Sequence, residues 1–282
     1  MTKQIAIIEG NHQGLVSISA DGVISGAAEQ FGSVLHQIAP DIRYHVERPH
    51  FDDFHYDKTC LDDCDGVVFT GSANHWSADD KKAHPARQLM MLAFDKGLPV
   101  FGSCYGMQLA ITVLGGRNRA HPSQTEFAIA RDICCTDDGV SHPLYAGKPA
   151  KFDALAMHRD EAFILPQGAQ SLSFNNHSQH QSLVYEKGDV CFWGVQYHPE
   201  LSFAAIANYI ERNDVDSFSD VLAFTSALGL PANKAQLIAD FAGYKGASDT
   251  AFIARYQIDE TITNLAIHRC ELVNFLKLIN AL

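Results

Sequence analysis

The chain has 282 residues, a formal net charge of −12, 46% hydrophobic and 19% charged residues. This composition predicts a folded protein with a large core, and the acidic balance argues against nucleic acid as the main ligand. No apolar run reaches the length of a membrane span, and no signal-peptide-like stretch follows Met1, so we expect no membrane partner. Seven scattered cysteines without a Cys-x-x-Cys pair favour a reduced, cytoplasmic protein over a disulfide framework.

The first hundred residues alternate between strand and helix patterns. Apolar or alternating runs predict strands over 4–9, 42–47 and 66–70, and helical patterns cover 26–38 and 85–96. This rhythm predicts an α/β fold with a mostly parallel, helix-covered sheet. Because such sheets bind ligands beyond the carboxyl ends of their strands, we expect Gly10, Gly71 and Cys104 to meet at one crevice.

The next strand and helix enclose a cysteine between two glycines. Pro99–Ser103 reads as a buried strand and Met107–Leu114 as a helix, and the turn between them is Gly102-Ser103-Cys104-Tyr105-Gly106. This is the pattern of a nucleophile elbow with cysteine in place of serine. The helix N-terminus favours a thiolate, and the N–H of Tyr105 points to where an oxyanion could form. Alone, the pattern also fits a small buried cysteine, so a base is needed elsewhere.

The chain from residue 116 to 200 has weaker helical patterns. Short strands are expected over 127–133, 150–155, 169–174, 183–185 and 190–197. The polar segment 175–181 contains His177 and His180, but without a third ligand we interpret it as a solvated loop and predict no metal site. The last strand delivers His198-Pro199-Glu200.

The sequence changes character after Ile210. Residues 211–217 resemble a linker, and three helical patterns follow over 219–228, 233–242 and 258–282. We therefore expect an α/β domain over 1–212 and an all-helical C-terminal extension over 213–282. The apolar stripe of the last helix favours packing on the α/β domain, with a homodimer or partner surface as the alternative.

His198 and Glu200 are suited to act as a base and its orienting carboxylate. The two residues are two positions apart on an extended segment, so we expect their side chains on one face. Glu200 can then accept a hydrogen bond from one imidazole N–H. With Cys104 at another strand end of the same sheet, this predicts a Cys-His-Glu triad.

The chain resembles the class I glutamine amidotransferases, whose hallmarks are a G-x-C-x-G-x-Q elbow and a G-V-Q-F-H-P-E strand. The matching segments are Gly102–Gln108 and Gly194–Glu200, and Thr70-Gly71-Ser72 and Met157–Asp160 match two further family segments. The resemblance covers about residues 4–206. It is strongest to stand-alone members similar to the amidotransferase domain of GMP synthetase, and it implies a flavodoxin-like sheet with helices on both faces.

The resemblance also implies roles for individual residues. Cys104 attacks the γ-amide of glutamine, and the N–H groups of Gly71 and Tyr105 form the oxyanion hole. Gln108 and His158 bind the substrate. No metal or organic cofactor is implied, and the ammonia released would pass to a separate synthetase or acceptor protein.

Some positions depart from the family pattern. Met107 replaces a usual histidine, which we expect to change the pocket wall, and Ala128 stands where an E-x-G turn is common. Tyr105 and Tyr197 are larger or more polar than the typical Leu and Phe.

Three functions therefore remain as hypotheses. The first is a glutamine amidotransferase or glutaminase that releases ammonia. The second is a γ-glutamyl peptidase or hydrolase acting on larger γ-glutamyl compounds. The third is a non-catalytic regulatory or binding protein, which the intact set Cys104, His198 and Glu200 disfavours.

Overall fold

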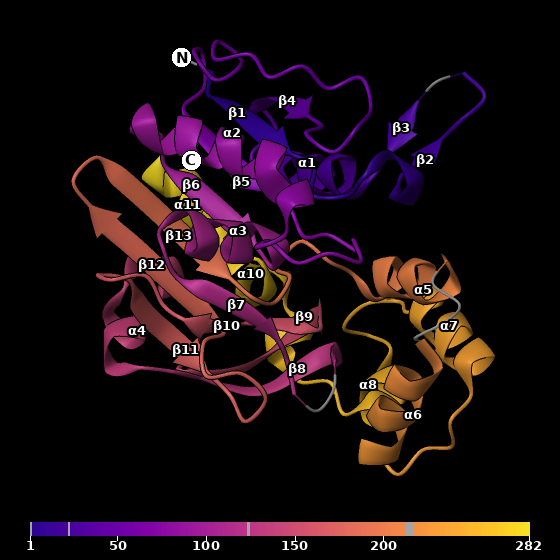
Figure 1. Ribbon diagram of the computed structural model, residues 1–282. Coiled ribbons are helices and arrows are strands. Elements are labelled where there is room, and N and C mark those ends of the chain that lie inside the picture. Colours follow the sequence, from indigo (N-terminus) through magenta and orange to yellow (C-terminus); the bar gives the residue numbers. More distant parts are fainter. Residues whose placement is uncertain (1, 22, 123–124, 213–216) are drawn as a thin grey trace.

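The computed structural model describes residues 2–21, 23–122, 125–212 and 217–282. Among these, nine strands form one sheet in the order β4-β1-β5-β6-β13-β12-β11-β8-β9 (Figure 1). The parallel part consists of β4 (Arg43–Glu47), β1 (Gln4–Ile8), β5 (Gly66–Phe69), β6 (Val100–Ser103) and β13 (Val190–Val195). The antiparallel part consists of β12 (Ser182–Lys187), β11 (Gln170–Phe174), β8 (Glu126–Cys135) and β9 (Lys151–His158). The predicted α/β fold with a mostly parallel sheet is confirmed, with antiparallel strands added at one edge.

Helices cover both faces of the parallel part. On one face, α1 (Ala27–Ile38) and α11 (Cys270–Leu278) pack Phe31 and Phe275 into a cluster with Ile5. On the other, α2 (His84–Asp95) and α3 (Tyr105–Val113) pack Leu89 into a cluster with Ile8. Ile5 and Ile8 point to opposite faces because side chains alternate along a strand. Burial on both faces explains the unbroken apolar runs of these strands, and it is the flavodoxin-like arrangement.

A smaller group of helices packs against β8 and β9 rather than on the parallel strands. It contains α5 (Phe203–Arg212), α6 (Ser217–Ala227), α7 (Lys234–Ala242) and α8 (Thr250–Tyr256), which lie together beside the sheet (Figure 1). Phe203 lies 5.0 Å from the ring of Phe241 and 4.9 Å from that of Phe252. Phe127 of β8 and Leu155 of β9 belong to the same apolar cluster. We call this group the helical lobe.

The predicted linker over 211–217 is helical at both ends. Residues 211 and 212 complete α5, and residue 217 begins α6; residues 213–216 lie outside the described part of the chain. Residues 203–212 form an amphipathic helix whose apolar side is buried. Because this burial stabilises the helix, the polar residues on its other side do not end it.

The single long helix predicted over 258–282 is wrong. The structure has three helices there, namely α9 (Glu260–Thr263), α10 (Leu265–His268) and α11. Asn264 separates the first two, because its side chain accepts a hydrogen bond from the N–H of Ala266 and its ψ of 105° is not helical. Such side-chain bonds to the nearby backbone compete with a continuous helix.

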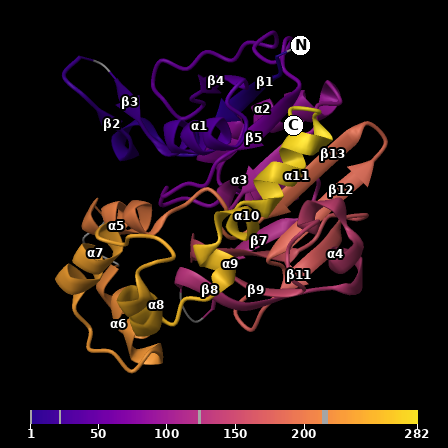
Figure 2. The ribbon, with the colours of Figure 1, turned by 180° about the vertical axis from the view of Figure 1, so that it is seen from behind.

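The apolar stripe of this region is buried within the chain itself, apart from Leu265, which is 57% exposed. Four of its residues, Leu272, Phe275, Leu276 and Ile279, belong to the core of the sheet, and α11 lies along the sheet in Figure 2. Packing on the α/β domain is therefore confirmed. A homodimer through the C-terminal helices stays a prediction and would need other residues of these helices.

Short elements were not evident from the sequence. They are β2 (Ser17–Ile18), β3 (Ile24–Ser25), β7 (Arg117–Ala120), β10 (Asp160–Ile164), α4 (Asp137–Ser141) and three 3₁₀ turns at Gln13–Leu15, Lys81–Ala83 and Pro143–Tyr145. Segments of two to five residues are too short for a period to show, and β7 is polar. In the described residues, no helix is both long and apolar enough to cross a membrane.

Candidate active site

Cys104 lies in a tight turn between β6 and α3. Its backbone has φ +48° and ψ −100°, a conformation that side-chain-bearing residues rarely adopt. A Cβ atom on Gly102 would lie 2.7 Å from the carbonyl carbon of Gly106, and one on Gly106 would lie 2.4 Å from the carbonyl oxygen of Phe69. Neither position has room for a side chain. The geometry of the predicted elbow is therefore present.

The neighbouring strand brings His198 and Glu200 to the same place. β13 pairs in parallel with β6, and the N–H of Cys104 donates to the carbonyl of Val195 at 2.7 Å. Nδ1 of His198 lies 2.7 Å from Oε1 of Glu200. A Cβ atom on Gly71 would lie 2.5 Å from Cε1 of His198 and 3.6 Å from Cβ of Cys104, so the three residues meet at one point.

The strand expected to carry His198 ends earlier than predicted. β13 stops at Val195, and His198 and Glu200 lie in the turn beyond it. The pairing of their side chains is as expected, but its cause is this turn and not the alternation of a strand. Proline at 199 cannot donate a ladder hydrogen bond, which favours leaving the sheet here.

The charges at the site favour the protonated imidazole of His198. Burial lowers the pKa of His198, but the negative charges of Glu200 and Cys104 and hydrogen bonds to both raise it further, to about 10 in net. The imidazole is therefore protonated at neutral pH. A protonated imidazole beside a cysteine can act as the acid that protonates a leaving group.

Gly71 and Tyr105 lie on either side of Cys104. Gly71 follows β5, and its carbonyl accepts a hydrogen bond of 2.9 Å from the hydroxyl of Thr70. Tyr105 is the first residue of α3, so its N–H belongs to the first helical turn, which has no intrahelical acceptor. An oxyanion hole formed by these two N–H groups stays a prediction.

Gln108 and His158 make hydrogen bonds within the protein. Nε2 of Gln108 donates to the carbonyl of Asp160 at 2.9 Å. Nε2 of His158 lies 2.7 Å from Oε2 of Glu126, and its Nδ1 lies 3.1 Å from the carbonyl of Asp160. Both side chains therefore fix the segment around Asp160, and substrate binding by them stays a prediction.

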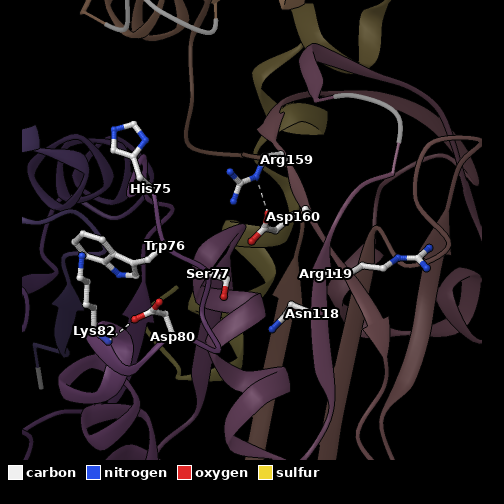
Figure 3. A pocket seen from close by; sticks show the side chains of 10 residues that line it. His75, Trp76, Ser77, Asp80, Lys82, Asn118, Arg119, Arg159 and Asp160 are labelled. Atoms are coloured by element: carbon white, nitrogen blue, oxygen red, sulfur yellow. Dashed lines mark hydrogen bonds and ion pairs between the residues drawn. The ribbon is translucent and has the colours of Figure 1, made fainter.

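A pocket adjoins this segment. Its volume is about 440 Å³, and its lining residues are His75, Trp76, Ser77, Asp80, Lys82, Asn118, Arg119, Ala120, Arg159 and Asp160. Figure 3 shows Arg159 and Asp160 on one side, and Trp76, Asp80 and Lys82 on the other. Nδ2 of Asn118 donates to the backbone carbonyl of Gln108 at 2.9 Å, which joins the pocket to the helix of the elbow.

The segment 175–181 is not the exposed loop that its composition predicts. Gln181 is fully buried, and its amide donates to Glu126; Ser178 is buried and donates to Glu161 at 3.2 Å. Buried carboxylates need such donors, which explains why polar residues turn inward here. Among the described residues, no group of three or more His, Cys, Asp or Glu side chains could hold a metal ion.

Comparison with known proteins identifies the family. The class I glutamine amidotransferase model matches residues 27–216. The chain belongs to the class I glutamine amidotransferase family. It is 32% identical over 202 residues to a γ-glutamyl-L-1-hydroxyisopropylamide hydrolase of a Pseudomonas species. The matched region covers 71% of this chain and 68% of the relative.

Other relatives of this amidotransferase family member fit the same assignment. It is 34% identical over 149 residues to a glutamine-hydrolysing GMP synthase of Thermomicrobium roseum, over 52% of this chain and 25% of that synthase. This chain thus matches only about a quarter of the GMP synthase. A glutamine amidotransferase of Thermotoga maritima has the same fold, with a TM-score of 0.65 at 15% identity over 99% of this chain and 98% of that one.

Two departures from the amidotransferase pattern have structural outcomes. Met107 is fully buried in the apolar cluster between the sheet and α2, so it does not form a pocket wall, and that expectation was wrong. The cause is its position on α3, where it faces the sheet and would lie 2.9 Å from a Cβ atom on Gly194. Ala128 has φ +63°, which explains why glycine is common at this position.

Two polar residues beside the triad were missed. Ser103 is fully buried, and its hydroxyl lies 3.0 Å from each oxygen of Glu200. Gln196 is also fully buried, and its Nε2 donates to Sγ of Cys104 at 3.5 Å. The only signal was that both are polar residues inside apolar strand patterns.

Proposed function

We propose that this protein hydrolyses the γ-amide bond of glutamine or of a γ-glutamyl amine, with Cys104 as nucleophile. The supporting observation is the His198–Glu200 pair, buried against Cys104 at the elbow. Acyl transfer through a thioester requires a nucleophile and a base that a carboxylate orients. Here the nucleophile is a cysteine held in a strained turn.

In the acylation step, the thiolate of Cys104 attacks the γ-carbonyl carbon and a C–S bond forms. The carbonyl oxygen becomes an oxyanion, which accepts hydrogen bonds from the N–H groups of Gly71 and Tyr105. Protonated His198 then gives its proton to the leaving nitrogen. The C–N bond breaks, ammonia or an amine departs, and a γ-glutamyl thioester remains.

In the deacylation step, neutral His198 accepts a proton from water as the water oxygen attacks the thioester. The C–S bond breaks, glutamate leaves, and the thiolate of Cys104 pairs again with protonated His198. Glu200 remains a carboxylate throughout and keeps the imidazole oriented.

The pocket beside Gln108 supports recognition of the amino-acid end of the substrate. We place the α-carboxylate near the guanidinium of Arg159 and the α-ammonium near the carboxylate of Asp160, whose Nε and Oδ1 atoms are 2.9 Å apart. A guanidinium binds a carboxylate through two parallel hydrogen bonds, so this pair suits a zwitterion. Gln108 would act through the backbone of the same segment.

A larger γ-glutamyl amide is the second candidate substrate. The observation that favours it is the relative from Pseudomonas, which is named for a γ-glutamyl amide larger than glutamine and covers most of this chain. The GMP synthase relatives favour glutamine, with the ammonia passing to a separate synthetase or acceptor protein.

The experiment is a steady-state comparison of glutamine with γ-glutamyl amides of increasing size, and with α-glutamyl amides as the negative control. We expect release of ammonia or amine from γ-linked substrates only, and none by Cys104→Ala. Equal activity of Cys104→Ala, or cleavage of α-linked compounds at the same rate, would contradict the proposal. The substrate with the highest kcat/KM decides between the two candidates.

A further inference from the structure

The segment that carries His198 and Glu200 lies beyond the end of β13 and is joined to the rest of the sheet by isolated backbone hydrogen bonds. Because β13 ends at Val195, the turn beyond it lacks ladder hydrogen bonds. The N–H of His198 donates to the carbonyl of Leu155 at 2.8 Å, and the N–H of Leu201 donates to the carbonyl of His198 at 3.3 Å. A catalytic group in such a turn needs further contacts to keep its geometry.

The residue before His198 is held by α11. Tyr197 is fully buried, and its hydroxyl donates to Oε1 of Glu271, the second residue of α11. Burial and the charge of Glu271 raise the pKa of Tyr197 well above its ordinary value, so the phenol remains a donor. Nζ of Lys148 lies 2.5 Å from the same carboxylate oxygen, and both charged side chains are buried. Lys148 thus compensates the charge that binds Tyr197.

The residue after Glu200 is held by α10. Nε2 of His268 lies 3.0 Å from the carbonyl of Leu201. Burial lowers the pKa of His268 to about 4, so the ring is neutral, and a hydrogen bond to a carbonyl requires the proton on Nε2. His268 is 4% exposed, so water does not compete for this bond.

The same C-terminal segment also packs against the strand that leads to Cys104. Phe275 of α11 lies 5.6 Å, centroid to centroid, from Phe101 of β6. The helices behind the sheet therefore contact the nucleophile's strand and both ends of the turn that carries the base (Figure 2). A packed helix is stiff, so these contacts fix Cys104 and His198 relative to each other.

We propose that α10 and α11 position the catalytic turn, with Tyr197, Glu271 and His268 as positioning residues that hold it from both sides. The inference rests on the proposed function, since it assigns these residues to the triad described there. Tyr197 stands where phenylalanine is typical of the family, so the hydroxyl contact is a feature of this chain.

The test uses two variants that keep the apolar bulk and remove the hydrogen bonds of one side chain, which for Tyr197 join it to Glu271 and to Tyr145. Tyr197→Phe removes the hydroxyl, and His268→Met removes the donor to Leu201. We expect each to lower kcat about tenfold with KM changed less than about twofold, because a misplaced base slows chemistry more than binding. His268→Gln, which keeps a donor, should restore kcat to within about threefold of wild type.

A matched control separates positioning from loss of stability. Nδ2 of Asn274, also on α11, donates to the carbonyls of Leu144 and Ala146 at 3.0 Å and not to a residue of the catalytic turn. We expect Asn274→Ala to lower the melting temperature as much as the two test variants while kcat stays within about twofold of wild type. If all three variants lose stability equally and all keep wild-type kcat, the helices only stabilise the fold and the inference is wrong.

A substrate-free readout distinguishes failure of this inference from failure of the proposed function. It is the rate at which iodoacetamide alkylates Cys104, followed by peptide mapping, because the thiolate depends on its pairing with His198. Equal rates in wild type and His198→Ala would contradict the proposed function. A slow rate in His198→Ala, with wild-type rates in Tyr197→Phe and His268→Met, would overturn the inference alone.

Discussion

At the scale of single residues, the site depends on a few buried polar contacts around one strained cysteine. Cys104 is held at positive φ by the close approach of Gly102 and Gly106 to their neighbours. His198 is held by Glu200, and Glu200 in turn accepts hydrogen bonds from Ser103. Each contact is short and shielded from water, so removing any one of them should cause a measurable loss of activity or stability.

Cys104→Ala should abolish turnover and leave the fold intact. The side chain is small and alanine keeps the Cβ atom, so the packing around the turn is unchanged while the nucleophile is lost. Steady-state kinetics and circular dichroism check the two halves. Substantial hydrolysis by a homogeneous Cys104→Ala preparation would show that another group attacks the substrate.

Ser103→Ala should lower kcat with little change in KM. A hydrogen bond to a charged group contributes about 1.5–3 kcal/mol, and even half of it lost in the transition state corresponds to a kcat roughly three- to tenfold lower. Kinetics on the best γ-glutamyl substrate measure this. A change in KM alone would mean that Ser103 acts on binding and not on the orientation of Glu200.

Arg159→Met should change KM and not kcat, the reverse of the change expected for Ser103→Ala. Figure 3 places the guanidinium in the pocket beside Asp160. Losing it removes a contact that ground state and transition state share, so KM should rise by about tenfold or more while kcat stays near wild type. An unchanged KM would remove the pocket from substrate binding.

At the scale of elements, β8 contains a backbone conformation that its residue does not favour. Ala128 has φ +63° and no exposed surface. Such a conformation costs a residue with a Cβ atom about 1–2 kcal/mol, and glycine adopts it freely. Asp132 of the same strand also has a positive φ, +54°, which aspartate tolerates more readily than alanine does.

Ala128→Gly should therefore stabilise the protein by about 0.5–1 kcal/mol, after the greater entropy of the unfolded glycine is counted. Ala130→Gly is the matched control, since Ala130 lies two residues along the same strand, is equally buried and has no positive φ. It should destabilise by about 1 kcal/mol. Urea unfolding measures both, and equal destabilisation by the two changes would contradict the account.

The sequence predicted the elements best where a local pattern carries the information. Residues 102–106 and 198–200 are short local patterns that contain the proposed nucleophile, its glycines and the base–carboxylate pair, although a turn and not a strand brings His198 to Glu200. Ser103 and Gln196 could not be assigned, since each finds its partner on the other strand: Ser103 bonds to Glu200, and Gln196 to Cys104. The break between α9 and α10 depends on a hydrogen bond of Asn264 that competes with an otherwise good helical pattern.

At the scale of the whole molecule, the last helix belongs to the core of the sheet although it is far from it in sequence. Phe275 and Ile279 pack with Ile5 and Phe101, whereas α5 to α8 form the helical lobe against β8 and β9. The division into 1–212 and 213–282 stays a prediction. No pattern within 258–282 reveals where its apolar side packs, because that depends on the shape of the finished sheet.

Stability should fall on mild acidification. Burial lowers the pKa values of His50, His177 and His268 to about 4, below the ordinary value of 6.5. Between about pH 6.5 and 4 the unfolded chain binds protons that the folded chain does not, so this stability is present above pH 6.5 and is lost as the pH falls. The raised pKa of His198 acts oppositely, with stability present below pH 6.5 and lost toward pH 10.

Of these three histidines, His268 has the least exposed surface. It should account for on the order of 2 kcal/mol of the decrease in the free energy of unfolding between pH 7 and pH 5. The measurement is the free energy of unfolding at both pH values for wild type and His268→Gln. We expect the variant to lose less on acidification by about that amount. The same pH dependence in both proteins would show that His268 does not remain neutral.

The central claim is that Cys104 is the nucleophile of a pocket shaped for a γ-glutamyl group. The most direct measurement is the intact mass after exposure to an electrophilic glutamine analogue, followed by peptide mapping of the adduct. The account predicts a single adduct on Cys104 that excess glutamine or a γ-glutamyl amide prevents. An adduct on another residue, no adduct at all, or labelling of Cys104 that neither compound prevents would contradict it.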